Sequence, residues 1–474
     1  MSFIKIIPTF SGKRVHMVGI KGAGMTALAE ILVKGGATVT GSDTAEVFFT
    51  DDVLKKIGIV PFVGFSTEHV AADVDHVIYS TAYSPDKNQE LAAASSRGIP
   101  LLNYPEAVGM LTRERMGLLV AGTHGKTTIS AMLAEALRNA DEDPVAIVGS
   151  RVRAWDGNAL AGDGKYLVLE ADEYQDKLRY YQPFSAILTS IDWDHPDFFL
   201  DEHVYADAFR EFVCRIPHHG ALVYCADSAS VVKVAADATC RRLSYGFNTD
   251  ADFHIIGYEA VSLGTVEAGG TRTRFEIVHE GESLGMFSLR IPGKHNAQNA
   301  ASVVALASFL RIDMEAVRTA LAEFSGTARR SEFIGEYKAA LVYDDYAHHP
   351  EELRATLSAF RELYPDKTIT AVFHPHTFTR TAALLSEFAQ SFDDADHVLV
   401  LDIYGSAREG TGRVTSMDLV REINRFVHDK AEYVPTIPEV VEKLKGSLHG
   451  GDLLITFGAG DVWRVAEGVT GKAV

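Results

Sequence analysis

A strand-like apolar segment, Met116–Ala121, leads directly into the loop Gly122-Thr123-His124-Gly125-Lys126-Thr127-Thr128, and a helix-like stretch to Arg138 follows. In this order of elements the backbone N–H groups of the loop and the start of the helix can cradle a phosphate chain. Lys126 can neutralise terminal phosphate charge, and a threonine hydroxyl can ligate magnesium. The segment therefore predicts nucleotide binding in a parallel α/β sheet, against the alternative of a plain strand-to-helix turn with an incidental lysine.

A second glycine-rich loop stands near the start of the chain. Gly22-Ala23-Gly24-Met25-Thr-Ala27 fits the pattern G-x-G-x-x-A, and Ser42-Asp43 ends the next strand-like segment. Such a loop can hold a pyrophosphate and the acid a ribose, as in a nicotinamide dehydrogenase, but alone it also fits a tight turn in any βαβ unit. Because the chain carries two phosphate-binding loops, we expect two separate ligands in two domains, with a second phosphorylated ligand at this loop.

Strand-like and helix-like segments alternate along the whole chain, which predicts an α/β architecture. The length of 474 residues favours roughly three domains. We place them at residues 1–113, 114–328 and 329–474. In the central domain, residues 251–289 alternate apolar and polar side chains, which predicts antiparallel strands added to a parallel sheet. A third strand-helix alternation begins at Ala340–Asp344.

The charge balance and the cysteines exclude several classes of protein. With 45 basic and 64 acidic residues the formal net charge is -19, which argues against nucleic-acid binding. Met1–Phe10 does not resemble a signal peptide, and no window approaches 18 uninterrupted apolar residues, so we expect no membrane insertion. Cys214, Cys225 and Cys240 are odd in number and form no CxxC pair, which is typical of buried thiols in a reducing, cytoplasmic compartment.

Two acidic clusters follow neighbouring strand-like segments of the central domain. They are Glu170-Ala-Asp172-Glu173 and Asp192-Trp-Asp194-His195. In a parallel sheet both would emerge at the carboxyl edge, beside the loop that ends in Lys126. Oxygen ligands and an imidazole beside phosphates are what a magnesium site needs, so we expect one there. For any single acid, a helix cap or a solvated loop is the alternative.

The rest of the candidate residues lie further along the chain. His295-Asn296-Ala-Gln298-Asn299 begins a helix, and Arg329-Arg330 is either a phosphate clamp or a solvated basic pair. Asp344-Asp345-Tyr346-Ala-His348-His349-Pro350 and His374-Pro-His376-Thr377-Phe-Thr-Arg380 each follow a strand. Four histidines raise the possibility of zinc, but two are adjacent and no Cys or HExxH accompanies them, so substrate recognition or polar bonding in the core is favoured.

Taken in order, these motifs resemble the Mur ligases of peptidoglycan synthesis over essentially the whole chain. The resemblance implies a Rossmann-like UDP-binding first domain, a central P-loop ATPase domain and a Rossmann-like third domain that binds the amino acid. It implies ATP and magnesium as cofactors, with Lys126 on the phosphates, Thr127, Glu170 and His195 on the metal, and Asn296, Asn299, Arg330 and Asp345 around the nucleotide. The substrate-binding residues would be Gly22, Ala23, Gly24, Met25, Ser42, Asp43, Ser80, Thr81, Tyr346, His348, His376 and Arg380.

In this family a sugar carboxylate attacks the γ-phosphate of ATP, and an amine then attacks the acyl phosphate; we expect Lys126, Glu170, His195, Arg330, His348 and His376 to serve this chemistry. The loop segments most resemble the branch that joins L-alanine to UDP-N-acetylmuramate. Thr377 replaces an arginine common in that branch, and the segments around Glu170 and Asp194 also resemble the recycling branch that attaches a whole tripeptide. A non-catalytic nucleotide-binding regulator is a further alternative, and the chain is expected to be a monomer or a homodimer.

Overall fold

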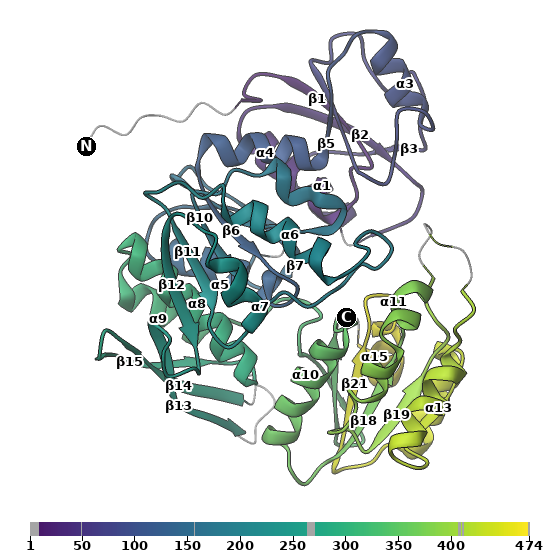
Figure 1. Cartoon of the computed structure of the whole chain (residues 1–474). Helices are drawn as coiled ribbons and strands as arrows, with labels where there is room; N and C mark the ends of the chain where they lie inside the picture. Colours follow the sequence, from purple (N-terminus) through teal and green to yellow (C-terminus); the bar gives the residue numbers. More distant parts are fainter. Residues whose placement is uncertain are drawn as a thin grey trace.

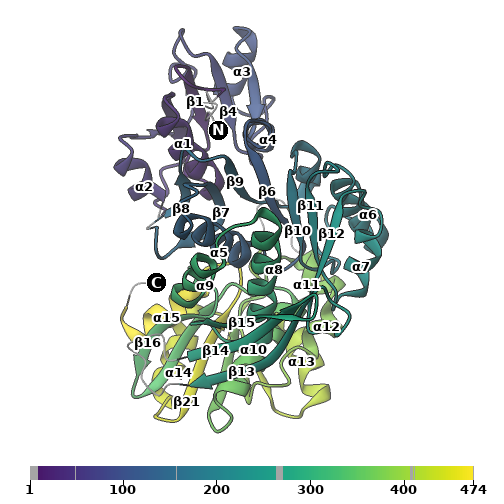
Figure 2. The same ribbon diagram turned by 90° about the vertical axis from the view of Figure 1, so that its left-hand side faces the viewer.

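The computed structural model describes residues 9–48, 50–155, 157–262, 271–405, 409 and 412–472. They form three β-sheets with helices packed on them, one after another along the chain. In Figure 1 the first sheet lies at the top, the central sheet below it, and the third at the lower right. Figure 2 shows the same stacking from the side. The predicted three-part α/β fold is confirmed.

The first sheet is parallel throughout and has the strand order β3-β2-β1-β4-β5. Its strands are β1 (Arg14–Val18), β2 (Thr38–Asp43), β3 (Phe62–Val63), β4 (His76–Tyr79) and β5 (Leu101–Asn103), and its helices are α1 (Ala23–Lys34), α2 (Thr50–Lys56), α3 (Gln89–Ser96) and α4 (Tyr104–Glu114). Asn103 starts α4 because its side chain and that of Glu106 each bond the other's backbone N–H. The glycine-rich loop between β1 and α1 lies at the carboxyl edge, where ligands bind in such sheets.

The central sheet has ten strands in the order β15-β14-β13-β12-β11-β10-β6-β9-β7-β8. The strands are β6 (Met116–Ala121), β7 (Val145–Val152), β8 (Gly157–Ala161), β9 (Tyr166–Glu170), β10 (Ser185–Leu188), β11 (Ala221–Cys225), β12 (Arg241–Gly246), β13 (Phe253–Ser262), β14 (Thr271–His279) and β15 (Glu282–Leu289). The helices are α5 (Lys126–Asn139), η1 (Tyr174–Tyr180), α6 (Glu202–Val213), α7 (Ala229–Ala235), α8 (Lys294–Leu310) and α9 (Met314–Glu323). β13, β14 and β15 pair antiparallel, as the alternation of residues 251–289 predicted.

The third sheet has the order β16-β17-β21-β18-β19-β20. Its strands are β16 (Glu332–Tyr337), β17 (Ala340–Asp345), β18 (Thr368–Phe373), β19 (His397–Val400), β20 (Ala431–Tyr433) and β21 (Asp452–Phe457). The helices are α10 (Pro350–Leu363), α11 (Phe378–Ala383), α12 (Leu385–Ala389), α13 (Ser416–Phe426), α14 (Ile437–Ser447) and α15 (Trp463–Thr470). The edge strand β16 is antiparallel to β17 and was not predicted, because the alternation was taken to begin at Ala340.

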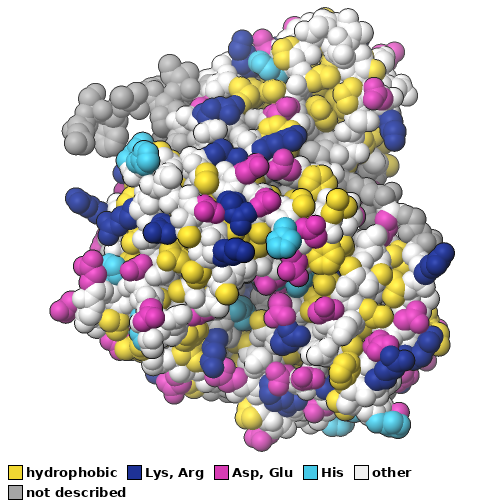
Figure 3. All heavy atoms as spheres, viewed as in Figure 1, with side chains coloured by type: hydrophobic (Ala, Val, Ile, Leu, Met, Phe, Trp, Pro, Cys, Tyr) yellow, Lys and Arg dark blue, Asp and Glu magenta, His cyan; other side chains and the backbone are white. Residues whose placement is uncertain are grey.

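One apolar core runs through the first and central domains, whereas the third domain has a core of its own on each face of its sheet. Cys225 and Cys240 are buried, but Cys214 is exposed, so the prediction of three buried thiols was wrong. Cys214 ends α6 on its solvent side. Within the described residues no helix is both long and apolar enough to cross a bilayer. Acidic and basic side chains are interspersed over the face shown in Figure 3.

Candidate active site

The loop between β6 and α5 is held in shape by its two glycines. Gly122 has a φ of 129° and Gly125 a φ of 78°, values that residues other than glycine rarely adopt. A Cβ on Gly125 would stand 2.7 Å from Oδ1 of Asn299, at the start of α8. The loop therefore passes so close to α8 that both its backbone conformation and the available space require glycine.

Lys126 turns back over this loop. Its Nζ donates to the carbonyl of Thr123 at 3.1 Å and to Glu173 Oε2 at 2.8 Å. Burial alone lowers the pKa of Lys126, but the carboxylates of Glu173, Asp172 and Glu170 surround it and raise the pKa above its usual value. The ammonium is thus charged and aimed at the loop in which a phosphate chain would lie.

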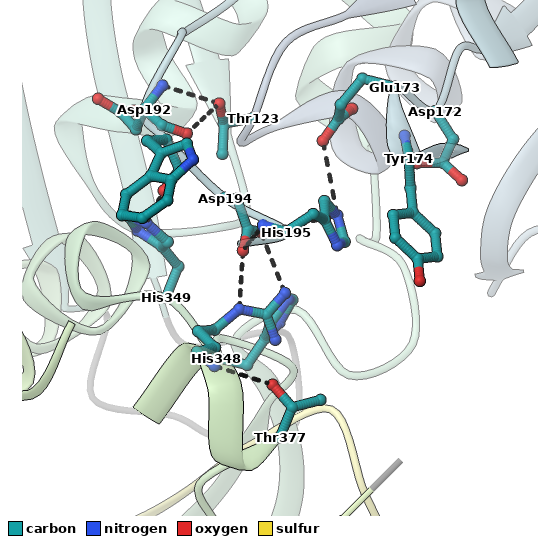
Figure 4. A network of polar contacts seen from close by, with 12 residues as sticks. Thr123, Asp172, Glu173, Tyr174, Asp192, Asp194, His195, His348, His349 and Thr377 are labelled. Atoms are coloured by element: carbon teal, nitrogen blue, oxygen red, sulfur yellow. Dashed lines mark hydrogen bonds and ion pairs between the residues drawn. The ribbon is translucent and has the colours of Figure 1, made fainter. Parts of the chain in front are cut away.

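The two acidic clusters meet the loop in two different ways. The Thr127 hydroxyl donates to Glu170 Oε1 at 2.8 Å, and burial raises the pKa of Glu170. His195 instead lies with Asp172 and Glu173, and among the described residues these three form the group whose ligand atoms all lie within 4.8 Å of one another. His195 Nε2 is 3.8 Å from Glu173 Oε1, the pair joined by a dashed line in Figure 4. The predicted metal set Thr127, Glu170 and His195 is therefore divided between two neighbouring positions.

Glu173 had no predicted role of its own, although its acidic cluster was recognised. It is 1% exposed and bonds Lys126, and its Oε1 accepts the Tyr205 hydroxyl at 3.1 Å. His195 adopts a φ of 55°, a strained backbone conformation for a residue with a side chain, and Tyr174 stacks on its ring. Sequence spacing could not distinguish Glu173 from Asp172, because only the turn after β9 decides which of them faces Lys126.

A cavity of about 270 Å³ opens between the central and third domains. The residues of the Lys126 loop that line it are His124, Gly125, Thr127 and Thr128. Residues of α8 contribute His295, Asn296, Gln298 and Asn299, and the third domain contributes Arg330, Asp345, Glu351 and Glu352. The structure therefore brings together every residue predicted around the nucleotide, except that Gly122, Thr123 and Lys126 lie beside the cavity in the same loop.

Arg330 and Asp345 enter this cavity from the third domain. Arg330 stacks over the Tyr346 ring at 5.1 Å and lies 3.5 Å from Glu352. Asp345 accepts the backbone N–H groups of Ser331 and Ala347, yet burial raises its pKa to about 6. The bend that brings Arg330 inward is strained, since Arg329 and Ser331 both have positive φ angles.

His124 belongs to the Lys126 loop and lies against residues of both the central and the third domain. Its ring nitrogens lie 3.3 Å from Asp192 and 3.3 Å from Glu352, and its ring packs on His349. Burial alone lowers the pKa of His124, but the two carboxylates raise it to about 9. Glu352, on α10, was not predicted; its position depends on how the two domains dock and has no signature in the sequence.

The candidate acceptor residues form a second interdomain cluster, of which Figure 4 labels Asp194 and His348. Arg380 holds Asp194 through two bonds, Nε to Oδ1 at 2.7 Å and Nη2 to Oδ2 at 3.2 Å, and both residues are about 5% exposed or less. His348 and His376 stand 6.2 Å apart, ring to ring, near this pair. Burial, together with the charge of Arg380, lowers the pKa of His348 to about 3 and that of His376 to about 4, so both imidazoles are neutral near pH 7.

Among the described residues, the four histidines considered for zinc do not form a group whose ligand atoms could hold one metal ion. His348 Nδ1 contacts the carbonyl of Tyr346 at 3.0 Å, and His349 packs on His124. His374 lies beside Asp461, and His376 stacks on Tyr404. Thr377 has a φ of 69°, and its side chain caps α11 through the N–H of Arg380.

In the first domain, side-chain hydrogen bonds to the backbone shape the glycine-rich loop between β1 and α1. Asp43 accepts the backbone N–H groups of Lys21 and Thr44, each at 2.7 Å, so the acid shapes the loop before Gly22. Ser42 is fully buried, and its hydroxyl donates to Glu90. Ser80, half-buried, packs against Gly19, and Thr81 follows it, at the same sheet edge as Ala23, Gly24 and Met25 at the start of α1.

Three protein-family models match successive parts of the chain. Residues 14–116 match a model described as Mur ligase family, catalytic domain, residues 120–307 the Mur ligase middle domain, and residues 329–460 the Mur ligase, glutamate ligase domain. A UDP-N-acetylmuramate–L-alanine ligase of Desulfitobacterium hafniense is 40% identical over 96% of this chain and 98% of its own. The chain belongs to the Mur ligase family. A protein of the same name from Salinibacter ruber is 38% identical over 96% of this Mur ligase and 94% of its own length.

Solved structures agree with this family. The UDP-N-acetylmuramate-alanine ligase MurC of Thermotoga maritima superposes with a TM-score of 0.78 at 26% identity, covering 96% of this Mur ligase and 97% of that chain. A murein peptide ligase of Psychrobacter arcticus has a TM-score of 0.68 at 22% identity, covering 98% and 100%, which shows a shared fold. As the motifs predicted, this Mur ligase is an ATP-dependent enzyme that forms amide bonds.

Proposed function

We propose that this Mur ligase joins L-alanine to the carboxylate of UDP-N-acetylmuramate, with ATP consumed through an acyl phosphate, in peptidoglycan synthesis. The cavity between the central and third domains carries the proposal. In it the Lys126 loop faces Arg330 across the domain boundary, with the acidic clusters beside the loop. The names of the relatives that are 34–40% identical support L-alanine as the acceptor.

For the phosphate end, we assign Lys126 and Arg330 to the transferring phosphoryl group and the loop 122–128 to the phosphate chain. Asn296, Asn299 and Asp345 belong to the nucleoside side. Magnesium fits the donor set, since Thr127 and Glu170 offer oxygens at one position, and Asp172, Glu173 and His195 offer two carboxylates and an imidazole at the next. When bound, magnesium offsets the negative charge of the phosphates.

The reaction proceeds in two steps. A carboxylate oxygen of the sugar attacks the γ-phosphorus, the bond to the ADP oxygen breaks, and an acyl phosphate forms. The neutral amine of L-alanine then attacks the acyl carbon, and inorganic phosphate leaves. His348 and His376 are uncharged but weak bases at these pKa values, so either imidazole can relay the proton that the amine loses to the departing phosphate, which leaves as hydrogen phosphate. Arg380 and Tyr346 are assigned to the acceptor, and the closed domains keep water from the acyl phosphate.

The remaining assignments concern the first domain, the bounds of the other two domains, the cellular compartment and the oligomeric state. We assign residues 1–113 to UDP-sugar binding, through Gly22, Ala23, Gly24, Met25 and the carboxyl-edge residues Ser42, Asp43, Ser80 and Thr81. Residues 114–328 form the ATP-binding domain and 329–474 the acceptor domain. We further propose a cytoplasmic monomer or homodimer.

A substrate panel scored by phosphate release tests the proposal. Release from ATP should require both UDP-N-acetylmuramate and L-alanine, with magnesium present. The tripeptide L-alanyl-γ-D-glutamyl-meso-diaminopimelate is the alternative acceptor, because the segments around Glu170 and Asp194 also resemble the branch that attaches this tripeptide. Faster turnover with the tripeptide than with L-alanine would reassign the acceptor, and no release with any acceptor would reject the ligase.

A further inference from the structure

β15 forms one edge of the ten-stranded central sheet, and within the described residues only β14 pairs with it. In Figure 1 it lies at the left-hand margin of the molecule. With 8 residues it is longer than the edge strands β3, β5, β8, β16 and β20, which have 2, 3, 5, 6 and 3 residues. A long edge strand offers a row of unpaired N–H and C=O groups to which another strand can be added.

Arg318 of α9 lies against this edge. Its Nη1 donates to the carbonyl of Met286 at 2.7 Å, and its Nη2 donates to the carbonyl of Leu284 at 2.9 Å. In an antiparallel pair, successive residues of a strand turn their backbone groups alternately toward the partner and away from it. The two carbonyls that Arg318 holds are two residues apart and therefore belong to the set that faces away from β14.

The guanidinium of Arg318 is fixed in this position by two further contacts. Its Nε donates to Glu315 Oε1 at 3.2 Å, and its central carbon lies 4.5 Å from the centre of the buried Phe287 ring. Gly285 stands between the two carbonyls with a φ of +87°, and a Cβ there would be 3.4 Å from Arg318 Nη1. The outer side of β15 is thus covered by a cation that has a defined place.

We propose that Arg318 caps β15 against strand addition by a second copy of this enzyme. The β15 of a second copy carries the same outward groups, so two copies related by a twofold axis can pair these strands antiparallel and bond each other's backbone. The exposed side chain of Met286 would be covered by such pairing. With Arg318 in place, an incoming strand has to displace a guanidinium from two carbonyls, which costs those hydrogen bonds and desolvates the charge.

Sedimentation velocity of the full chain at several micromolar concentrations tests the proposal. Arg318→Met keeps an apolar stem over Phe287 and removes the donors, so its self-association constant should exceed that of the wild type by about tenfold or more. Arg421→Met is the matched control, because Arg421 makes an exposed pair with Asp418 three residues before it on α13. This control should sediment as the wild type does, and the rate of phosphate release should be unchanged in both variants.

Hydrogen exchange followed by mass spectrometry shows whether β15 is the surface that pairs. In Arg318→Met the amides of residues 282–289 should exchange more slowly at high protein concentration than at low, because the outward N–H groups gain partners. Arg318→Gln takes its place if Arg318→Met does not fold, since one amide cannot hold both carbonyls.

Three results would overturn the proposal. The first is wild-type sedimentation in whichever variant folds. The second is self-association without slower exchange in β15, which would put the pairing surface elsewhere. The third is a loss of stability with unchanged association, which would show that Arg318 only holds α9 to the sheet.

Discussion

Lys126 is a buried cation held by carboxylates, and its removal should affect the rate of catalysis. We expect Lys126→Ala to lower phosphate release by about a thousandfold, because it removes the ammonium that we assign to the transferring phosphoryl group. Initial rates at saturating ATP measure this effect. Lys165→Ala is the matched control, since Lys165 is an exposed lysine whose nearest acid is Glu142 at 3.2 Å. Near-normal turnover in Lys126→Ala would contradict the assignment of the loop.

His124 makes stability depend on pH in a defined direction. Its pKa rises from 6.5 to about 9 in the folded chain, against the effect of burial, because Asp192 and Glu352 flank it. The protonated ring stabilises the fold by about 3 kcal/mol below pH 6.5, and this contribution is lost between pH 6.5 and 9. Urea unfolding of wild type and His124→Gln at about pH 6 and pH 9.5 should show the difference in unfolding free energy shrinking at the higher pH. Equal differences at both pH values would rule out this pairing.

At the level of elements, the sequence predicted what local patterns determine. The strand-loop-helix order around Gly122 and Gly125, and the alternation over residues 251–289, depend on short-range periodicity and were confirmed. β16 was missed because its apolar pattern is short and interrupted by Gly335, where the pairing with β17 is irregular. Glu173 and Glu352 acquire their contacts only from the turn after β9 and from domain docking, which a linear pattern does not encode.

The loop between β6 and α5 allows a clean test of why glycine is required. Gly125→Ala meets two penalties, a φ of +78° and a Cβ 2.7 Å from Asn299 Oδ1. Gly58→Ala meets only the first, since Gly58 has a φ of +79° and nothing within 4 Å of its Cβ. We expect unfolding free energy to fall by about 1 kcal/mol for Gly58→Ala and by about 2–4 kcal/mol for Gly125→Ala. Equal losses in denaturant titrations would mean that the close approach to α8 costs nothing.

At the level of the whole molecule, charged side chains join the third domain to the central domain, and Trp193 packs against the apolar cores of both. The contacts that cross this boundary include Arg380 with Asp194, His124 with Glu352, and Arg153 with Glu332. Charged, hydrogen-bonded interfaces exchange their partners for water more readily than apolar ones, so this boundary is where the enzyme is expected to open for substrates.

The pair of Arg380 and Asp194 is the most deeply buried of these three contacts. Asp194→Asn leaves a buried guanidinium without its counter-charge, which should lower the unfolding free energy by about 3–5 kcal/mol. Glu422→Gln breaks the exposed pair with Arg425 on α13 and should cost less than about 1 kcal/mol.

The two losses are measured by denaturant titration, and the docking itself by small-angle X-ray scattering. Because the pair joins two domains with separate cores, Asp194→Asn should also increase the radius of gyration, whereas Glu422→Gln should not. A destabilised Asp194→Asn enzyme with an unchanged radius would show that the pair stabilises the domains internally and does not hold them together. Equal stability of the two variants would contradict a buried pair altogether.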